Sequence, residues 1–244
     1  MKNILYLMQM EVRKAHGKSM YLFLFLFILF TTLDNILHYK YNVAKPDLLV
    51  GNFGLSLFIT QIYLIYLAST YLSSEFSYGT SKNIFTGAFT RIEIINIKTF
   101  ALLLYSITLA IVNICIGIAG QLIVHSDIII YQSLIDLLKL VFIYWLYFFS
   151  VLAFSLLVSS ISLNRLYTII ISYAAFIFIG ELAAQVTSRD NSKLKDIIEN
   201  VPFYVVTNGF SSLHYSINSV IYIVIFSIFT YVIGLLIYKK RDLI

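Results

Sequence analysis

Charged residues are scarce in this 244-residue chain. Only 12% of its residues are Asp, Glu, Lys or Arg, whereas 60% are hydrophobic and the mean hydropathy is +0.88. An ordinary soluble domain is about a quarter charged and about half apolar. A water-soluble globule of this size could not bury so much apolar side chain, so the composition predicts an all-α protein whose solvent is lipid.

Residues that could carry chemistry are also few. The single cysteine, Cys115, excludes an intramolecular disulfide and a CxxC metal or redox site. The four histidines have no HExxH or other metal-ligand spacing, and no GxxxxGK[ST] loop is present to cradle ATP phosphates. Intramembrane catalysis would need a nucleophile and base, or a metal cluster, in the apolar stretches. We therefore predict no catalytic residues, no metal and no cofactor in this chain.

The apolar residues come in blocks of about twenty, the length that crosses a hydrocarbon core of about 30 Å as a helix. Before the first block, residues 1–18 place Ile4, Leu5, Met8 and Val12 on one stripe, which predicts an amphipathic helix in the membrane surface. We expect residues 1–244 to form a single transmembrane domain. Its six predicted spans cover residues 20–37, 53–72, 100–124, 135–158, 166–184 and 217–237.

The distribution of Lys and Arg predicts the orientation. Of the 17 basic residues, eleven lie at the two chain ends, in the 73–99 loop and at Arg165, and five lie in the loops on the opposite side. Because positive residues favour the cytoplasm, both termini and the 73–99 loop are predicted inside, and the 185–216 loop outside. The net charge of +5 thus serves as an orientation signal, and no nucleic-acid partner is expected.

Four charges lie close to span interiors, and all are near the predicted outer boundary: Asp34, Asp136, Lys139 and Glu181. Asp136 and Lys139 are three residues apart and could pair on one helix face. Two interpretations stay open at this point. The four residues are charges solvated at the membrane interface, or they form a polar outer vestibule.

The segment from Glu75 to Lys98 is too patterned for a simple linker. It combines serine caps, an acid at its start, a Gly-Thr step and basic residues, and it resembles the loop after the second span of the ABC-2 type permease family. The matching elements are Glu75, Gly79 with Thr80, Ile84 with Phe85, Thr90 with Arg91, and Lys98. The chain departs from the family at residues 86–89, where a proline is frequent and this sequence reads TGAF.

The resemblance implies a membrane subunit without its own nucleotide site. A short cytoplasmic coupling helix within residues 75–95 would sit in a groove of a separate ABC ATPase, which binds ATP and magnesium. Glu75, Gly79, Thr80, Arg91 and Lys98 would then couple the ATPase to the spans. A second permease subunit, identical or a sister chain, would face the first in a bacterial cytoplasmic membrane.

The substrate is inferred from size and composition. Small permeases of this kind are similar to lantibiotic-immunity and phenol-soluble-modulin exporters, and the aromatic-rich apolar interior suits an amphipathic or antimicrobial peptide, or a similar hydrophobic compound. We therefore expect an exporter. The alternatives are a non-transporting membrane scaffold or sensor subunit, and a proton-coupled secondary carrier.

Overall fold

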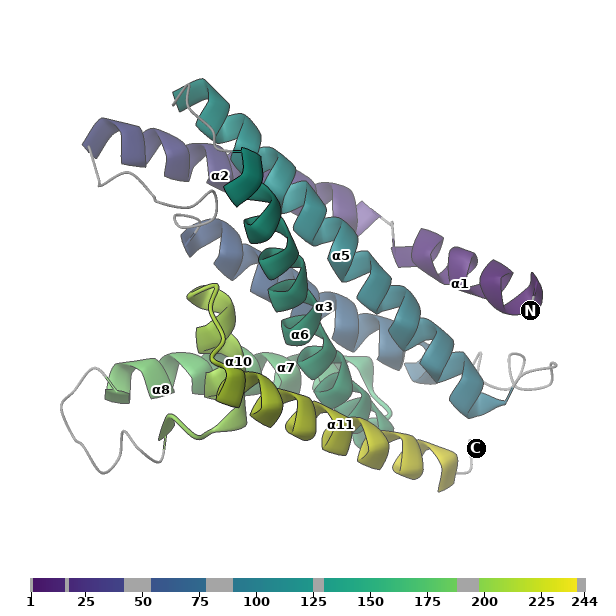
Figure 1. The fold of residues 1–244 in the computed structure, drawn as a ribbon. Coiled ribbons are helices and arrows are strands. Elements are labelled where there is room, and N and C mark those ends of the chain that lie inside the picture. The colour runs from purple at the N-terminus through teal and green to yellow at the C-terminus, as the bar shows by residue number, and fades with distance from the viewer. Residues whose placement is uncertain are drawn as a thin grey trace.

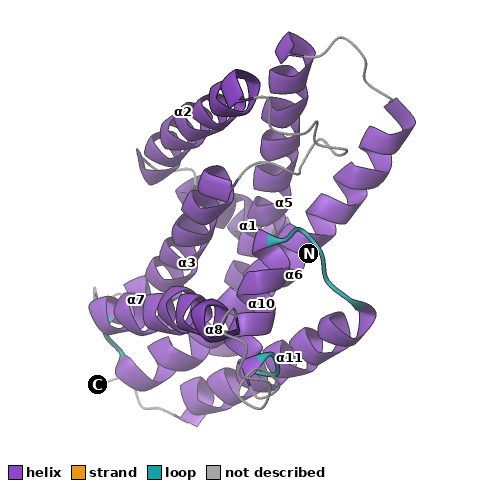
Figure 2. Ribbon diagram, turned by 90° about the vertical axis from the view of Figure 1, so that its left-hand side faces the viewer, coloured by secondary structure: helices purple, strands orange, loops and turns teal. Residues whose placement is uncertain are grey.

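The computed structural model describes residues 2–15, 18–41, 54–77, 90–124, 130–187 and 198–240. Within these ranges the regular structure is entirely helical (Figures 1 and 2), which confirms the predicted all-α fold. The helices are α1 (Lys2–Ala15), α2 (Lys18–Tyr41), α3 (Gly54–Ser77), α5 (Arg91–Val124), α6 (Ile130–Ser162), α7 (Arg165–Tyr173), the π-helix η1 (Ala174–Phe178), α8 (Ile179–Thr187), α10 (Pro202–Ser211) and α11 (Ile217–Lys240).

Four stretches of the described helices are long and apolar enough to cross a membrane: Ile92–Cys115, Leu137–Ser162, Arg165–Ala183 and Ile217–Lys240. They correspond to the last four predicted spans. The first two predicted spans lie in α2 and α3, each of 24 residues, where the apolar stretches with described side chains are shorter, Ser19–Phe30 and Leu57–Ser73. The complete six-span count and the orientation in the membrane stay predictions.

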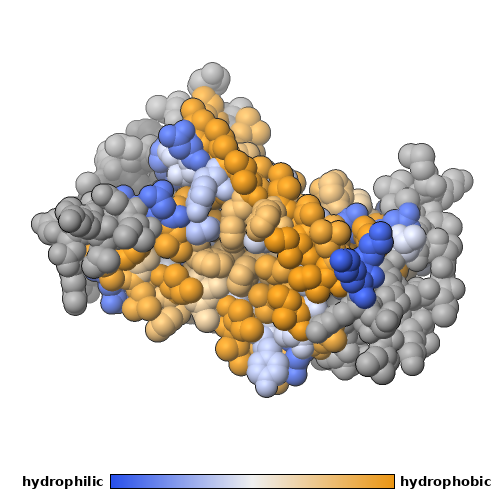
Figure 3. Space-filling view, turned by 90° about the horizontal axis from the view of Figure 1, so that it is seen from below, coloured by the Kyte–Doolittle hydropathy of each residue, from blue (hydrophilic) through white to orange (hydrophobic). Residues whose placement is uncertain are grey.

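The outer face of α11 is apolar. Ile217, Ile225 and Phe229 are each more than 60% exposed, and only 22% of this span is buried in the protein. Figure 3 shows a broad hydrophobic surface on the side of the molecule that α11 covers. Such a continuous apolar face is unfavourable in water and matches a helix that meets lipid.

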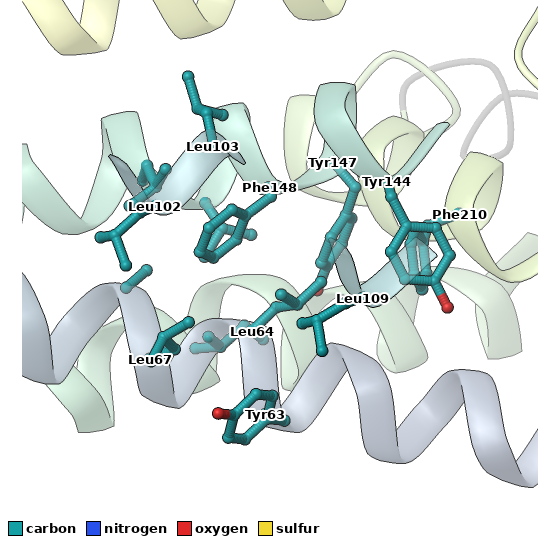
Figure 4. Close-up of a cluster of buried hydrophobic side chains, with 14 of the residues drawn as sticks. Tyr63, Leu64, Leu67, Leu102, Leu103, Leu109, Tyr144, Tyr147, Phe148 and Phe210 are labelled. Carbon is teal, nitrogen blue, oxygen red and sulfur yellow. The ribbon is translucent and has the colours of Figure 1, made fainter. Parts of the chain in front are cut away.

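Helix α6 is the centre of the bundle, because α3, α5, α7 and α11 all pack against it. Its aromatic residues Tyr144, Tyr147 and Phe148 are fully buried and meet Phe210 of α10 and the leucines of α3 and α5 (Figure 4). These three side chains therefore pack the interior of the protein.

Hydroxyl groups join the helices within this core. Ser155 of α6 lies 3.3 Å from Ser69 of α3 and 3.2 Å from Ser172 of α7, measured between the hydroxyl oxygens, and all three residues are fully buried. Ser150 makes a similar contact with Ser227 of α11 at 2.8 Å. Helices in lipid gain little from hydrophobic burial against each other, so small residues and interhelical hydrogen bonds hold them together.

The described helices extend into the predicted 73–99 loop from both sides. Helix α3 continues to Ser77, and α5 already begins at Arg91. A capping box explains this early start: Thr90 N–H donates to the Glu93 carboxylate at 2.7 Å, and Glu93 N–H donates to Thr90 Oγ1 at 3.3 Å. With 34 residues, or about 50 Å, α5 is longer than a hydrocarbon core is thick.

The predicted 185–216 loop contains a further helix. Its first residues extend α8 to Thr187, and α10 runs from Pro202 to Ser211, with proline at the start of the helix where no backbone N–H is needed. A tight turn connects α6 to α7. Leu163 adopts a φ of 50° there, and the Asn164 side chain accepts the Leu166 N–H at 2.9 Å.

Candidate functional site

Three helices meet around a buried ion pair at one end of the bundle. Lys98 of α5 and Glu11 of α1 are 6% and 8% exposed, and the Lys98 Nζ lies 3.9 Å from the Glu11 Oε2. Tyr71 of α3 directs its hydroxyl at the same carboxylate oxygen (2.7 Å) and at the Glu11 backbone carbonyl (2.5 Å). The Lys98 ammonium also lies 5.3 Å from the centre of the Tyr71 ring, within range of a cation–π contact. We call these three residues the Glu11 cluster.

The position of the Glu11 cluster follows from the ends of α3 and α5. Tyr71 lies six residues before the last residue of α3, and Lys98 lies seven residues after the first residue of α5. The cluster thus joins α1 to the two helices that residues 78–89 connect. A charge taken out of water is costly unless it is paired and hydrogen-bonded, so separating α1 from α3 and α5 would leave Glu11 or Lys98 without compensation.

A pocket lies toward the other end of α3, which we call the α10 end because α10 forms one wall. It has a volume of about 140 Å³ and is lined by Gln61 of α3, by Phe176, Ile177, Gly180 and Glu181 of η1 and α8, and by Tyr204, Thr207, Asn208 and Ser211 of α10. Gln61, Thr207 and Phe176 are buried, whereas Glu181, Asn208 and Ser211 are exposed. The first three therefore form the floor and the last three the rim.

Two local features shape this pocket. In the π-helix η1 the Ile179 N–H donates to the Ala174 carbonyl five residues earlier, a wide turn that is frequent at functional sites. Gly180 then lets α8 approach α10 closely, because a Cβ at this position would lie 2.7 Å from the Thr207 Oγ1. Gln61 fastens α3 to α10, since its Nε2 donates to the Ser211 hydroxyl at 2.9 Å and faces the Thr207 carbonyl at 3.5 Å.

Comparison with known proteins decides the family. The family model described as ABC-2 family transporter protein matches residues 7–181, which is more than half of the chain and contains α2, α3 and α5 to η1. This protein belongs to the ABC-2 transporter family. No curated protein sequence matches it. The chain is therefore a membrane component of an ABC transporter, with the multi-pass helical architecture expected of a transport subunit.

For the ABC-2 permease the structure places the predicted coupling residues unevenly. Glu75 lies in the last turn of α3 and Arg91 is the first residue of α5, but their side chains, like Gly79 and Thr80 altogether, lie outside the described residues. Lys98 is inside the protein, paired with Glu11. Its predicted role in coupling stays a prediction, and the geometry makes it an internal joint between helices.

The predicted vestibule residues divide in a similar way. Glu181 lines the pocket at the α10 end, and Lys139 is exposed on α6 and is not among the pocket residues. Asp34 and Asp136 belong to α2 and α6, and their side chains lie outside the described residues. Of the predicted vestibule residues with described side chains, Glu181 lines a pocket and Lys139 does not, and both interpretations of the four charges stay predictions.

Sequence reasoning missed two residues that the structure brings to these sites. Glu11 is the one acidic residue of α1, and its separation of 87 positions from Lys98 hides the pairing. Gln61 is the amide within the long apolar run of α3. A polar residue inside a membrane helix is a signal of function or interhelical bonding, and this signal could have identified Gln61.

Proposed function

We propose that this chain is the permease subunit of an ATP-driven exporter in a bacterial cytoplasmic membrane. It moves amphipathic or antimicrobial peptides, or similar hydrophobic compounds, out of the membrane or cell. A separate ABC ATPase binds ATP and magnesium and supplies the energy, and two permease subunits, identical or sister chains, face each other around the substrate path.

The Glu11 cluster is the main structural support for the proposed coupling to an ATPase. It fixes α1 to the last turns of α3 and the first turns of α5, the two helices on either side of residues 78–89. If the ATPase contacts residues 75–95, a displacement there pulls on both helices and on α1 together. Figure 1 draws the start of α1 and the end of α11 on the same side of the molecule, as both termini would be in a chain with an even number of spans.

A displacement of α3 and α5 would be passed on to α6. Helices α3 and α5 both pack on α6, and the Ser69–Ser155–Ser172 contacts extend the connection to α7. Buried, close-packed contacts of this kind transmit displacement because protein interiors are hardly compressible. A movement at the Glu11 cluster therefore reaches the helices that line the pocket at the α10 end.

Substitutions at the coupling segment test this function. Glu75→Ala and Arg91→Ala should reduce substrate transport by vesicles that contain the permease and its ATPase, because each removes a charge-assisted bond worth roughly 1.5–3 kcal/mol at the subunit contact. Gly79→Val should reduce transport more than either of these variants if residue 79 adopts a positive φ, which is costly for valine. The exposed Glu199, at the α10 end, supplies the control Glu199→Ala, which should transport like the parent.

The alternatives make different forecasts. A scaffold or sensor subunit requires that all four variants leave ATP hydrolysis and transport at the parent level. A secondary carrier requires that a proton gradient alone drives transport in vesicles without the ATPase. Either result would remove residues 75–98 from an ATP-coupling mechanism.

A further inference from the structure

We propose that the pocket between α3, α8 and α10 binds a primary ammonium group of the transported molecule or of a surrounding lipid. The inference names a chemical feature of the substrate and so rests on the proposed function. It concerns the region around Glu181 and Gln61, far along α3 from the Glu11 cluster. Gln61 and Tyr71 are ten residues apart on α3, about 15 Å along the helix axis.

The charge of the lining residues selects the ligand's sign. Among the described residues that line the pocket, Glu181 carries the only formal charge, and its side chain is on the exposed rim. A carboxylate held at the mouth of a hollow attracts a cation and repels an anion. The pocket is therefore unsuited to a phosphate or carboxylate ligand.

The hydrogen bonds at the floor select a donor. Gln61 uses its amide nitrogen on the Ser211 hydroxyl and the Thr207 carbonyl, so its amide oxygen is the atom it has to offer a ligand. The Thr207 hydroxyl donates to the Phe203 carbonyl at 2.8 Å, which leaves its oxygen lone pairs for a donor. A group with several N–H donors and no acceptor fits this floor, and an ammonium has three donors and no acceptor.

The size of the pocket limits what enters. Pockets that enclose a drug-sized ligand have volumes of roughly 300–1,000 Å³, whereas this one measures about 140 Å³. It holds one headgroup with a short stem, and the rest of an amphipathic molecule must stay outside. Exposed apolar residues beside the rim, Phe178 and Leu182, offer a surface for that remaining part.

Two kinds of molecule could place a primary ammonium in this pocket. One is a peptide, through a lysine side chain or its N-terminus, and the other is an ethanolamine lipid, through its headgroup. The chemistry is shared, so the experiment must separate them. A thiol placed on the rim provides the reporter. We choose Asn208→Cys in a Cys115→Ala background, because both replaced side chains are exposed and the native thiol is thereby removed.

The first measurement compares how fast this thiol reacts with two methanethiosulfonate reagents of similar size, one ending in a primary ammonium and one in a sulfonate. It uses the purified chain in nanodiscs without any ATPase, so a failure here leaves the proposed subunit function intact. We expect Glu181→Gln to slow the reaction of the ammonium reagent about fivefold and to speed that of the sulfonate reagent about fivefold, the effect of one unit charge about 4 Å away in water, which lowers the ratio of cationic to anionic reaction rates about 30-fold. Glu181→Asp and the control Glu199→Gln should keep the ratio within about twofold of the parent.

The second measurement is protection of the thiol by a ligand. In phosphatidylcholine nanodiscs, n-butylammonium should slow modification, whereas 1-butanol at the same concentration should not, and Glu181→Gln should abolish the protection. Equal protection by 1-butanol, or unchanged protection in Glu181→Gln, would show that the pocket does not select a cation and would overturn the proposal.

The source is then resolved with two further probes. Protection by a lysine-containing amphipathic peptide, lost when its amines are acetylated, assigns the site to a peptide substrate. Slower modification in ethanolamine-lipid nanodiscs than in phosphatidylcholine nanodiscs assigns it to lipid. If neither probe protects the thiol, the site serves neither molecule, and the inference is wrong even if n-butylammonium binds.

Discussion

The two ends of α3 differ in the environment of a nearby carboxylate, which is buried at one end and exposed at the other. Near the end of α3, the carboxylate of Glu11 is buried and pairs with Lys98 and Tyr71. Toward the start of α3, the carboxylate of Glu181 is exposed on the rim of a pocket. A charge that is satisfied internally fixes helices to one another. A charge left at a rim is available to a ligand, so the first end suits a mechanical joint and the second a binding site.

The largest loss of stability is expected when one partner of the buried Glu11–Lys98 pair is removed. Lys98→Met should leave the Glu11 carboxylate buried without its cation, at a cost of about 3–5 kcal/mol in the free energy of unfolding. The measurement is unfolding of the purified chain in mixed detergent micelles. Glu11→Gln together with Lys98→Met should recover most of the loss, because no charge is then left unpaired.

If Lys98→Met and the parent unfold at the same midpoint denaturant concentration, the buried pair does not stabilise the fold as described. The same follows if the double variant is less stable than the single one. Lys239→Met supplies the matched control, since this lysine is exposed in the last turn of α11, and it should change stability by less than about 0.5 kcal/mol.

The α10 end depends on close backbone packing. A Cβ on Gly209 would lie 1.9 Å from the ring of Tyr215, whose hydroxyl donates to the Val206 carbonyl at 2.7 Å. Gly209→Ala should therefore displace the Tyr215 ring and destabilise the protein by about 1–3 kcal/mol. Thermal unfolding measures the effect. The neighbouring Asn208→Ala, at an exposed position, should have little effect, and equal melting temperatures for Gly209→Ala and the parent would refute the packing described.

The smallest effect is expected between the two ends, in the hydroxyl contacts of α6. Ser155→Ala removes the contacts to Ser69 and Ser172, and interhelical hydrogen bonds in membrane proteins average about 0.6 kcal/mol each. We expect a loss of about 1 kcal/mol. The control Ser106→Ala replaces a buried serine whose hydroxyl donates to Leu103 of its own helix, and it should cost less. A loss from Ser155→Ala as large as that from Lys98→Met would invalidate the ranking of these regions.

Much of the fold follows from the sequence because apolar length is a strong signal in lipid. The predicted span over residues 217–237 is reproduced by α11, and the predicted N-terminal helix by α1. The ends of the helices were harder to predict than the spans, since the apolar pattern that marks a span stops where polar residues begin. At α5 the Thr90–Glu93 capping box was a readable T-x-x-E signal, and it places the helix start at Arg91, well before the predicted span.

The sites were predictable only in part. Glu181 stood out because an acid inside an apolar block is rare, and the structure places it on a pocket. The partner of Lys98 could not be read from the sequence, because helices far apart in the chain determine which side chains meet. The same holds for the π-helix η1, which has no sequence pattern of its own and which sets the wall of the pocket.

If a separate ATPase drives this permease through residues 75–98, transport in reconstituted vesicles must depend on ATP and on that ATPase. Vesicles should contain the chain alone, the chain with its ATPase, or the ATPase with the Arg91→Ala variant of the chain, with a lysine-containing amphipathic peptide as substrate. We expect no ATP hydrolysis and no transport by the chain alone, ATP-dependent transport by the pair, and reduced transport by the variant. ATP hydrolysis by the chain alone, or transport driven by a proton gradient without the ATPase, would contradict transport driven by a separate ATPase.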